Sequence, residues 1–240
     1  MGYLIVLTVG LAAGVLSGVI GTGSSMLLMP VLVFLYGPQQ AVPVMAIAAI
    51  MGNLGKALSW WREIDWKACS AYCATAVPGA MLGVRTLLAL PPHVVECALG
   101  VFFIAMVPVR RWLARHSVRL TLFQLMLIGA AVGFITGIVV STGPITVPVF
   151  MGYGLVKGAF LGTEAAGSLA VYIAKVSMFN HADALPPHVV ADGLITGVSI
   201  MLGTFGARRI VARMSPVAFR LVVDGLMLSS GLSLLFAASR

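Results

Sequence analysis

Long apolar stretches, separated by short polar or glycine- and proline-rich breaks, dominate the pattern of this chain. No charged residue occurs from Met1 to Gly55 or from Leu120 to Val156, and both runs are much longer than the roughly 20 apolar residues that cross a bilayer as a helix. The apolar positions are continuous, without the alternation that a membrane β-barrel strand requires. The pattern therefore predicts an all-α integral membrane protein.

Breaking the chain at its polar clusters predicts ten hydrophobic segments. They are expected at 3–20, 24–36, 42–61, 66–90, 92–109, 120–140, 144–154, 157–180, 188–207 and 216–237. The second and the seventh would rise only about 20 Å and 17 Å, against a hydrocarbon core of about 30 Å. Each of these two either spans the membrane or forms a re-entrant hairpin with the segment before it, so eight to ten membrane segments are expected.

The composition excludes an ordinary soluble domain. The 240 residues are 60% hydrophobic and 9% charged, whereas an ordinary soluble domain has about 45–50% and 25%. The segments leave no room for a catalytic domain outside the lipid, so any function must be built inside the membrane. Cys69, Cys73 and Cys97 lie in apolar stretches without a nearby histidine, so we expect core packing and neither a metal site nor a cofactor.

The formal net charge of +8 is best interpreted as a topology signal and not as a sign of nucleic-acid binding. Placing the most basic connection, residues 110–119, in the cytoplasm puts twelve of the fifteen basic residues inside; Arg85, Lys175 and Arg240 fall outside. The tryptophans Trp60, Trp61, Trp66 and Trp112 then gather at the inner boundary, where indole rings are favoured. Both termini are therefore expected to be periplasmic.

The two halves of the chain resemble each other in order, at offsets between 115 and 120 residues. The matched pairs include Gly14–Gly18 with Gly133–Gly137, Thr22–Gly23 with Thr142–Gly143, Met29–Leu32 with Val147–Phe150, and Met81–Gly83 with Met201–Gly203. Because each half holds five segments, an odd number, the second half must be inverted relative to the first. We expect a first repeat at 1–109, a basic cytoplasmic linker at 110–119 and a second repeat at 120–240.

These half-motifs resemble the TauE/SafE family of bacterial sulfite and organosulfonate exporters. Each consists of Gly-x3-Gly, a glycine-rich break and a short apolar segment with a central proline, and the resemblance covers nearly the whole chain. It implies an inner-membrane carrier of small sulfur-containing anions and no enzyme. The glycine run typical of the family reads Gly21–Ser25 here in the first half and Ser141–Pro144 in the second, a departure that bears on the substrate more than on the fold.

The two breaks are the candidate substrate site. A helix that begins inside the membrane presents unpaired N–H groups and a partial positive charge, which attract an anion. The expected substrate-binding residues at the breaks are Gly21, Thr22, Gly23, Ser24, Ser25, Ser141, Thr142 and Gly143. Asn53 and Ser168 occupy matched positions in segments three and eight, where each either contacts the ligand or only joins helices by a hydrogen bond. The Gly14/Gly18 and Gly133/Gly137 pairs are expected to allow close helix packing.

Glu164, about two turns into segment eight, is the candidate ion-coupling residue, because an intramembrane carboxylate that loads and releases a proton is a common coupling device. Its alternative role is a structural partner for a cation or a wet helix end near Lys157. Glu96 and Asp224 are weaker candidates. Lys56 and Lys175 are expected to extend to the membrane surface.

The expected function is a secondary transporter, most simply an exporter, of a small anion such as sulfite or an organosulfonate. A passive anion channel and a membrane-embedded enzyme are the alternatives, the second disfavoured because His93, His116, His181 and His188 lie at segment ends or in loops. The expected partners are the anion, a coupling proton or sodium ion, lipid and a second copy of the chain, with no nucleic acid.

Overall fold

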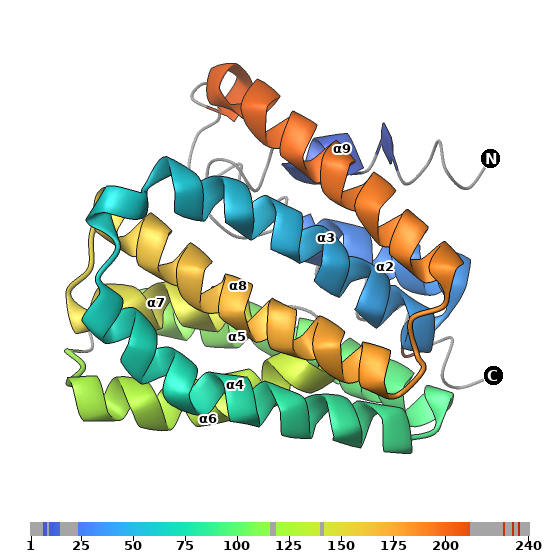
Figure 1. The fold of residues 1–240 in the computed structure, drawn as a ribbon. Coiled ribbons are helices and arrows are strands. Elements are labelled where there is room, and N and C mark those ends of the chain that lie inside the picture. Colours follow the sequence, from blue (N-terminus) through green and yellow to red (C-terminus); the bar gives the residue numbers. More distant parts are fainter. Residues whose placement is uncertain are drawn as a thin grey trace.

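A computed structural model describes residues 7–8, 10–14, 24–115, 119–139 and 142–211, and positions 228, 232 and 235. These residues form helices and loops without a strand, as the apolar pattern predicts (Figure 1). The described helices are α2 (Ser24–Tyr36), α3 (Pro38–Ser59), the 3-10 turn η1 (Trp61–Glu63), α4 (Trp66–Ala89), α5 (Pro92–Arg115), α6 (Leu122–Ile138), α7 (Gly143–Tyr153), α8 (Lys157–His181) and α9 (Pro187–Val211).

The short segments are short helices, as expected. α2 has 13 residues and α7 has 11. Pro144 sits in the first turn of α7, where its missing N–H removes no helical hydrogen bond. Gly154 ends α7 with a φ of 108°, a left-handed conformation that a residue with a Cβ adopts only at a cost.

The fifth helix ends later than the apolar pattern predicts and includes part of the basic middle stretch. The apolar pattern places the end of the fifth segment at residue 109, but α5 continues as a helix to Arg115. Arginine, leucine and alanine, which fill residues 110–115 along with Trp112, have good helix propensities, so the basic residues extend the helix instead of ending it.

Five helices pack side by side in the order α9, α3, α8, α4 and α6, with α8 in the middle (Figure 1). α2 packs on α3, while α7 contacts α6, α5 and α8. α4 lies against both α6 and α8, and α9 lies against α3. Helices from the two halves of the sequence therefore pack on one another, and the halves do not form two separate bodies.

Glycines allow α4 and α6 to approach at backbone distance. A Cβ on Gly133 would collide with the carbonyl oxygen of Ala76, and one on Gly137 with that of Ala80. Gly14 meets the carbonyl of Ile200 in the same way. The packing role expected for these glycines is confirmed; Gly18 lies outside the described residues.

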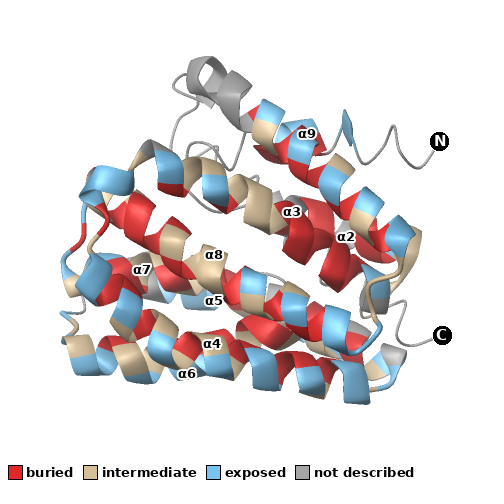
Figure 2. Cartoon of the chain, viewed as in Figure 1, coloured by how far each residue is buried: buried red, intermediate tan, exposed pale blue. Residues whose placement is uncertain are grey.

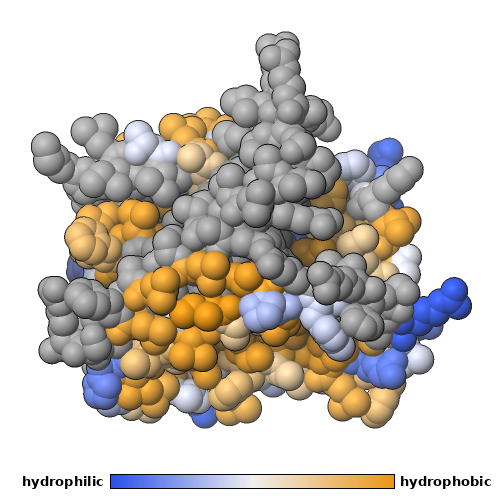
Figure 3. Space-filling model, turned by 180° about the vertical axis from the view of Figure 1, so that it is seen from behind, coloured by the Kyte–Doolittle hydropathy of each residue, from blue (hydrophilic) through white to orange (hydrophobic). Residues whose placement is uncertain are grey.

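Buried faces of the described helices point inward, and most outward positions are exposed (Figure 2). The buried apolar residues form two clusters, which α8 joins by contributing Val171 to one and Phe179 to the other. Apolar side chains dominate the described part of the face in Figure 3, with hydrophilic groups toward its sides. Within the described residues, α3 and α4 contain stretches long and apolar enough to cross a membrane, Gln40–Leu58 and Trp66–Ala89.

Candidate functional site

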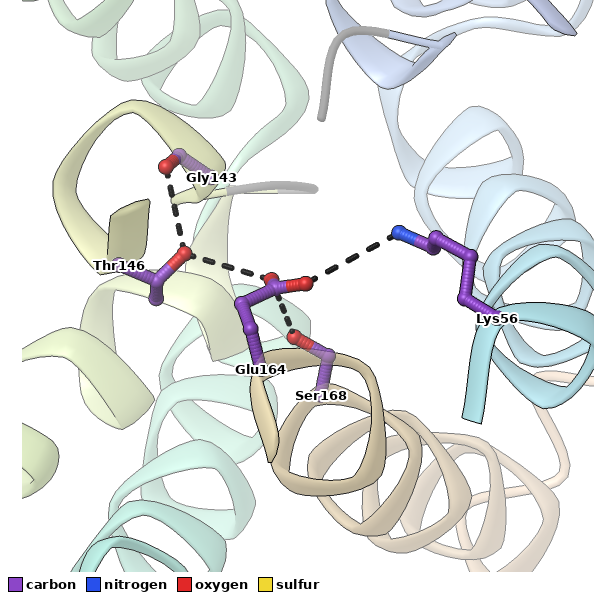
Figure 4. A network of polar contacts seen from close by, with 5 residues as sticks. All are labelled: Lys56, Gly143, Thr146, Glu164 and Ser168. Atoms are coloured by element: carbon purple, nitrogen blue, oxygen red, sulfur yellow. Dashed lines mark hydrogen bonds and ion pairs between the residues drawn. The ribbon is translucent and has the colours of Figure 1, made fainter. Parts of the chain in front are cut away.

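Glu164 lies buried at the centre of a polar cluster that joins three helices (Figure 4). Its Oε1 accepts a hydrogen bond of 2.9 Å from the Ser168 hydroxyl, one turn later on α8. The Thr146 hydroxyl on α7 lies 3.4 Å from the same oxygen. From α3, Lys56 Nζ stands 3.9 Å from Oε2, which is an ion-pair distance but too long for a direct hydrogen bond. The carboxylate therefore connects α3, α7 and α8.

Local helix geometry explains why these groups meet. Glu164 and Ser168 are four residues apart, so they share one face of α8. Thr146 lies in the first turn of α7, and its hydroxyl also lies 3.2 Å from the Gly143 carbonyl oxygen. A threonine hydroxyl has one proton, so Thr146 donates either to its own helix or to Glu164. This choice links the start of α7 to the charge state of Glu164.

The start of α7 offers fewer free donors than the sequence suggests. The N–H groups of Ile145 and Thr146 donate to the Thr142 carbonyl, at 2.8 Å and 2.9 Å, and Pro144 has no N–H. The Thr142 side chain does not cap the helix. The helix dipole remains at this terminus, but few of its backbone donors are free.

The Thr142 hydroxyl forms a 2.6 Å hydrogen bond with the Thr136 hydroxyl on α6. Thr136 also donates its proton to the Val132 carbonyl at 2.6 Å. Since each hydroxyl has one proton, Thr142 is the donor to Thr136. An anion that takes a hydrogen bond from Thr142 must therefore compete with Thr136.

Lys56 and Lys175 both extend into the protein and not toward its surface. Lys175 is fully buried, and its Nζ donates to the carbonyls of Thr136 and Val139 at 2.6 Å and 3.0 Å. Lys56 turns inward to Glu164, with its side chain 18% exposed. The expectation that they extend to the membrane surface is wrong, because the unpaired carbonyls at the end of α6 and the buried carboxylate offer partners inside the protein.

The structure describes some of the remaining candidate residues and not others. Ser25 is buried in the first turn of α2, and Asn53 is buried on α3, one turn before Lys56. Gly143 begins α7. Gly21, Thr22, Gly23, Ser141, Asp224 and the side chains of Ser24 and Glu96 lie outside the described residues. The structure thus brings Asn53, Ser168 and Glu164 to the facing helices α3 and α8.

Asp192 on α9 is a buried carboxyl that the sequence reasoning missed. It is 5% exposed, and its Oδ1 has no hydrogen-bond partner among the residues that the structure describes. A single acid one turn into an apolar segment is the same signal that singled out Glu164.

Neither the cysteine pair on α4 nor an apolar groove between α3, α8 and α9 resembles an anion site. Cys69 Sγ lies 4.0 Å from Cys73 Sγ on the next turn of α4, and no cluster of three metal-ligating side chains occurs within the described ranges. A groove of about 470 Å³ between α3, α8 and α9 is lined largely by apolar side chains such as Ile47, Met51 and Leu194. In a membrane, such a groove suits hydrocarbon better than an anion.

The sequence profile of the sulfite exporter TauE/SafE family matches residues 6–234, which is nearly the full chain. The chain belongs to the TauE/SafE family. Comparison with curated proteins and with solved structures gives no match. Membership makes this a membrane transport protein of the anion-exporter type, which agrees with its apolar helices.

Proposed function

We propose that the protein is an ion-coupled secondary transporter that exports a small sulfur-containing anion, such as sulfite or an organosulfonate. The observation that carries the proposal is the buried Glu164, which contacts Lys56 of α3, Ser168 of α8 and Thr146 of α7. A carboxylate buried among helices of a transporter is a functional group by default. The glycine-rich breaks Gly21–Ser25 and Ser141–Gly143, with Asn53 and Ser168, would supply the substrate contacts.

Proton coupling follows from competition between Glu164 and the anion. A substrate charge 4 Å from an ionised Glu164 would be repelled by about 4 kcal/mol at an effective dielectric constant of 20. Protonation of Glu164 removes this repulsion and weakens its hold on the Ser168 hydroxyl and the Lys56 ammonium. These donors can then bind the anion, so a proton and an anion occupy the site together.

Movement of one proton with a divalent anion is compatible with export. The pair carries one net negative charge, and outward movement of that charge along an inside-negative potential yields about 2.3 kcal/mol per 100 mV. The direction of net flux is then set by the membrane potential, the anion gradient and the pH gradient. Sodium is the alternative coupling ion if Glu164 does not titrate.

We also infer an inverted repeat, which is supported by matched close contacts. Gly83 on α4 faces the carbonyl of Phe134 on α6, and its sequence match Gly203 on α9 faces the carbonyl of Leu11. Each pair joins the fourth segment of one half to the first segment of the other. Under this arrangement α3 and α8 are equivalent helices at the centre, and Lys56–Glu164 crosses between them.

The proposed topology has residues 110–119 in the cytoplasm, both termini in the periplasm and a bacterial inner membrane around the helices. It is supported by the exposed Trp61, Trp66 and Trp112, which lie near the basic residues counted as cytoplasmic. Exposed tryptophans are favoured at a membrane boundary.

Transport by proteoliposomes tests the function. Purified protein should catalyse saturable sulfite flux and sulfite counterflow, since a carrier exchanges substrate whereas a passive channel does not accelerate counterflow. Glu164→Gln should keep sulfite binding and counterflow but lose flux driven by a pH gradient, because the amide keeps the shape and cannot exchange a proton. Unchanged pH-driven flux in Glu164→Gln would mean that Glu164 is not the coupling group.

A further inference from the structure

The ammonium of Lys175 ends at the break between α6 and α7 without reaching water. Its side chain is fully buried. Nζ lies 2.6 Å from the carbonyl oxygen of Thr136 and 3.0 Å from that of Val139. Among the described side chains, no carboxylate lies within ion-pair distance of Lys175.

Backbone carbonyls therefore act as the partners of this charge. α6 ends at Ile138, and the last four carbonyls of a helix have no N–H partner within the helix. They also form the negative end of the helix dipole. Two of these carbonyls, those of Thr136 and Val139, converge on the Lys175 ammonium.

Convergent carbonyl oxygens at the end of an interrupted helix have the chemistry of a site for a monovalent cation. Here an ammonium that the chain itself supplies occupies that point. We propose that the carbonyl-lined C-terminal end of α6 is a site for a monovalent cation, and that the ammonium of Lys175 fills it in place of a dissolved ion. The inference is independent of the proposed coupling through Glu164, because it concerns occupancy of the break and not transport.

Two consequences follow from this assignment. The native protein already holds an ammonium at the end of α6, so added methylammonium should not stabilise it. Removal of the ammonium should leave carbonyl oxygens facing an unoccupied space, which sodium or methylammonium can enter and which the larger choline cannot.

Thermal unfolding of the purified full-length protein tests the proposal. Lys175→Ala should unfold at a lower temperature than the native protein in choline chloride. Sodium chloride or methylammonium chloride at the same ionic strength should raise its midpoint by roughly 5–10 °C at a hundredfold excess over the Kd. The native protein should show the same midpoint in methylammonium chloride as in choline chloride.

Phe179→Ala is the matched control, because it removes a fully buried side chain from the same helix, one turn after Lys175, without removing an ammonium. It should show no specific recovery in sodium or methylammonium. If Lys175→Ala does not fold in choline chloride, the yield of monodisperse protein prepared in each salt becomes the measurement. Equal midpoints or equal yields of Lys175→Ala in the three salts would overturn the proposal, as would stabilisation of the native protein by methylammonium.

Discussion

Replacing Lys56 with methionine should destabilise the protein strongly, because it leaves the charge of Glu164 buried without its cation. Nζ and Oε2 are 3.9 Å apart, and two unit charges at that distance attract by about 4 kcal/mol at an effective dielectric constant of 20. The Glu164 side chain is only 5% exposed, so water cannot replace the lost partner. Removing one partner of such a buried pair costs about 3–5 kcal/mol.

A double-mutant cycle isolates the pair from other effects. Glu164→Gln alone should cost less than Lys56→Met, because the Lys56 side chain is 18% exposed and its ammonium can turn to water. The double variant, which buries neither charge, should be more stable than the sum of the single changes predicts, by about 2–4 kcal/mol. For a chain of this size, the loss in Lys56→Met corresponds to a decrease of roughly 6–20 °C in the unfolding midpoint.

Unfolding in detergent, followed by circular dichroism, measures all four corners of the cycle. Arg62→Met is the matched control, since Arg62 lies 5.5 Å above the exposed ring of Trp61 and should cost less than about 1 kcal/mol. Single changes that add to within about 0.5 kcal/mol would show that Lys56 and Glu164 do not stabilise each other, and would remove the link between α3 and α8.

Three further outcomes are expected. Gly137→Val should prevent folding or lower the unfolding midpoint sharply, because its Cβ would enter the backbone of α4, while Gly55→Ala, where a Cβ meets nothing within 4 Å, should leave the midpoint nearly unchanged. Thr142→Val should weaken sulfite binding by about 0.5–1.5 kcal/mol in isothermal titration if its hydroxyl donates to the anion, and native affinity in a folded variant would place the anion elsewhere. In a version without native cysteines, a cysteine at Arg240 and not one at Arg115 should react with an impermeant thiol reagent on intact cells, and the reverse pattern would overturn the topology.

The helices themselves follow closely from the sequence. Uncharged apolar runs leave the backbone no partner but itself in lipid, so continuous apolar segments become helices, and glycine, proline and hydroxyl clusters mark where they end. The expected segments 120–140 and 144–154 agree with α6 and α7 to within two residues at each end. The end of α5 was wrong by six residues, because loss of apolar character does not end a helix whose residues still favour it.

The candidate site was only partly predictable for a related reason. Glu164, Ser168 and Thr142 stood out because polar groups in apolar segments need partners. The position of Lys175 and Lys56 along the chain gives the depth of the Cα but not the direction of a long side chain. An interior partner therefore decides whether the ammonium turns inward, and that partner comes from a different helix in each case.

The sequence by itself determined an all-helical membrane protein, its two short helices α2 and α7, its internal similarity and its resemblance to an anion-exporter family. Only the tertiary structure decided that α4 packs on α6 and α9 on α3, that Lys56 meets Glu164, and that Lys175 occupies the end of α6. The periodicity and polarity of a segment depend on that segment alone, so the sequence is enough to predict a helix there. Contacts between helices depend on which faces meet, and in lipid those faces are selected by close backbone approach and by pairing of buried polar groups, neither of which is encoded in a single segment.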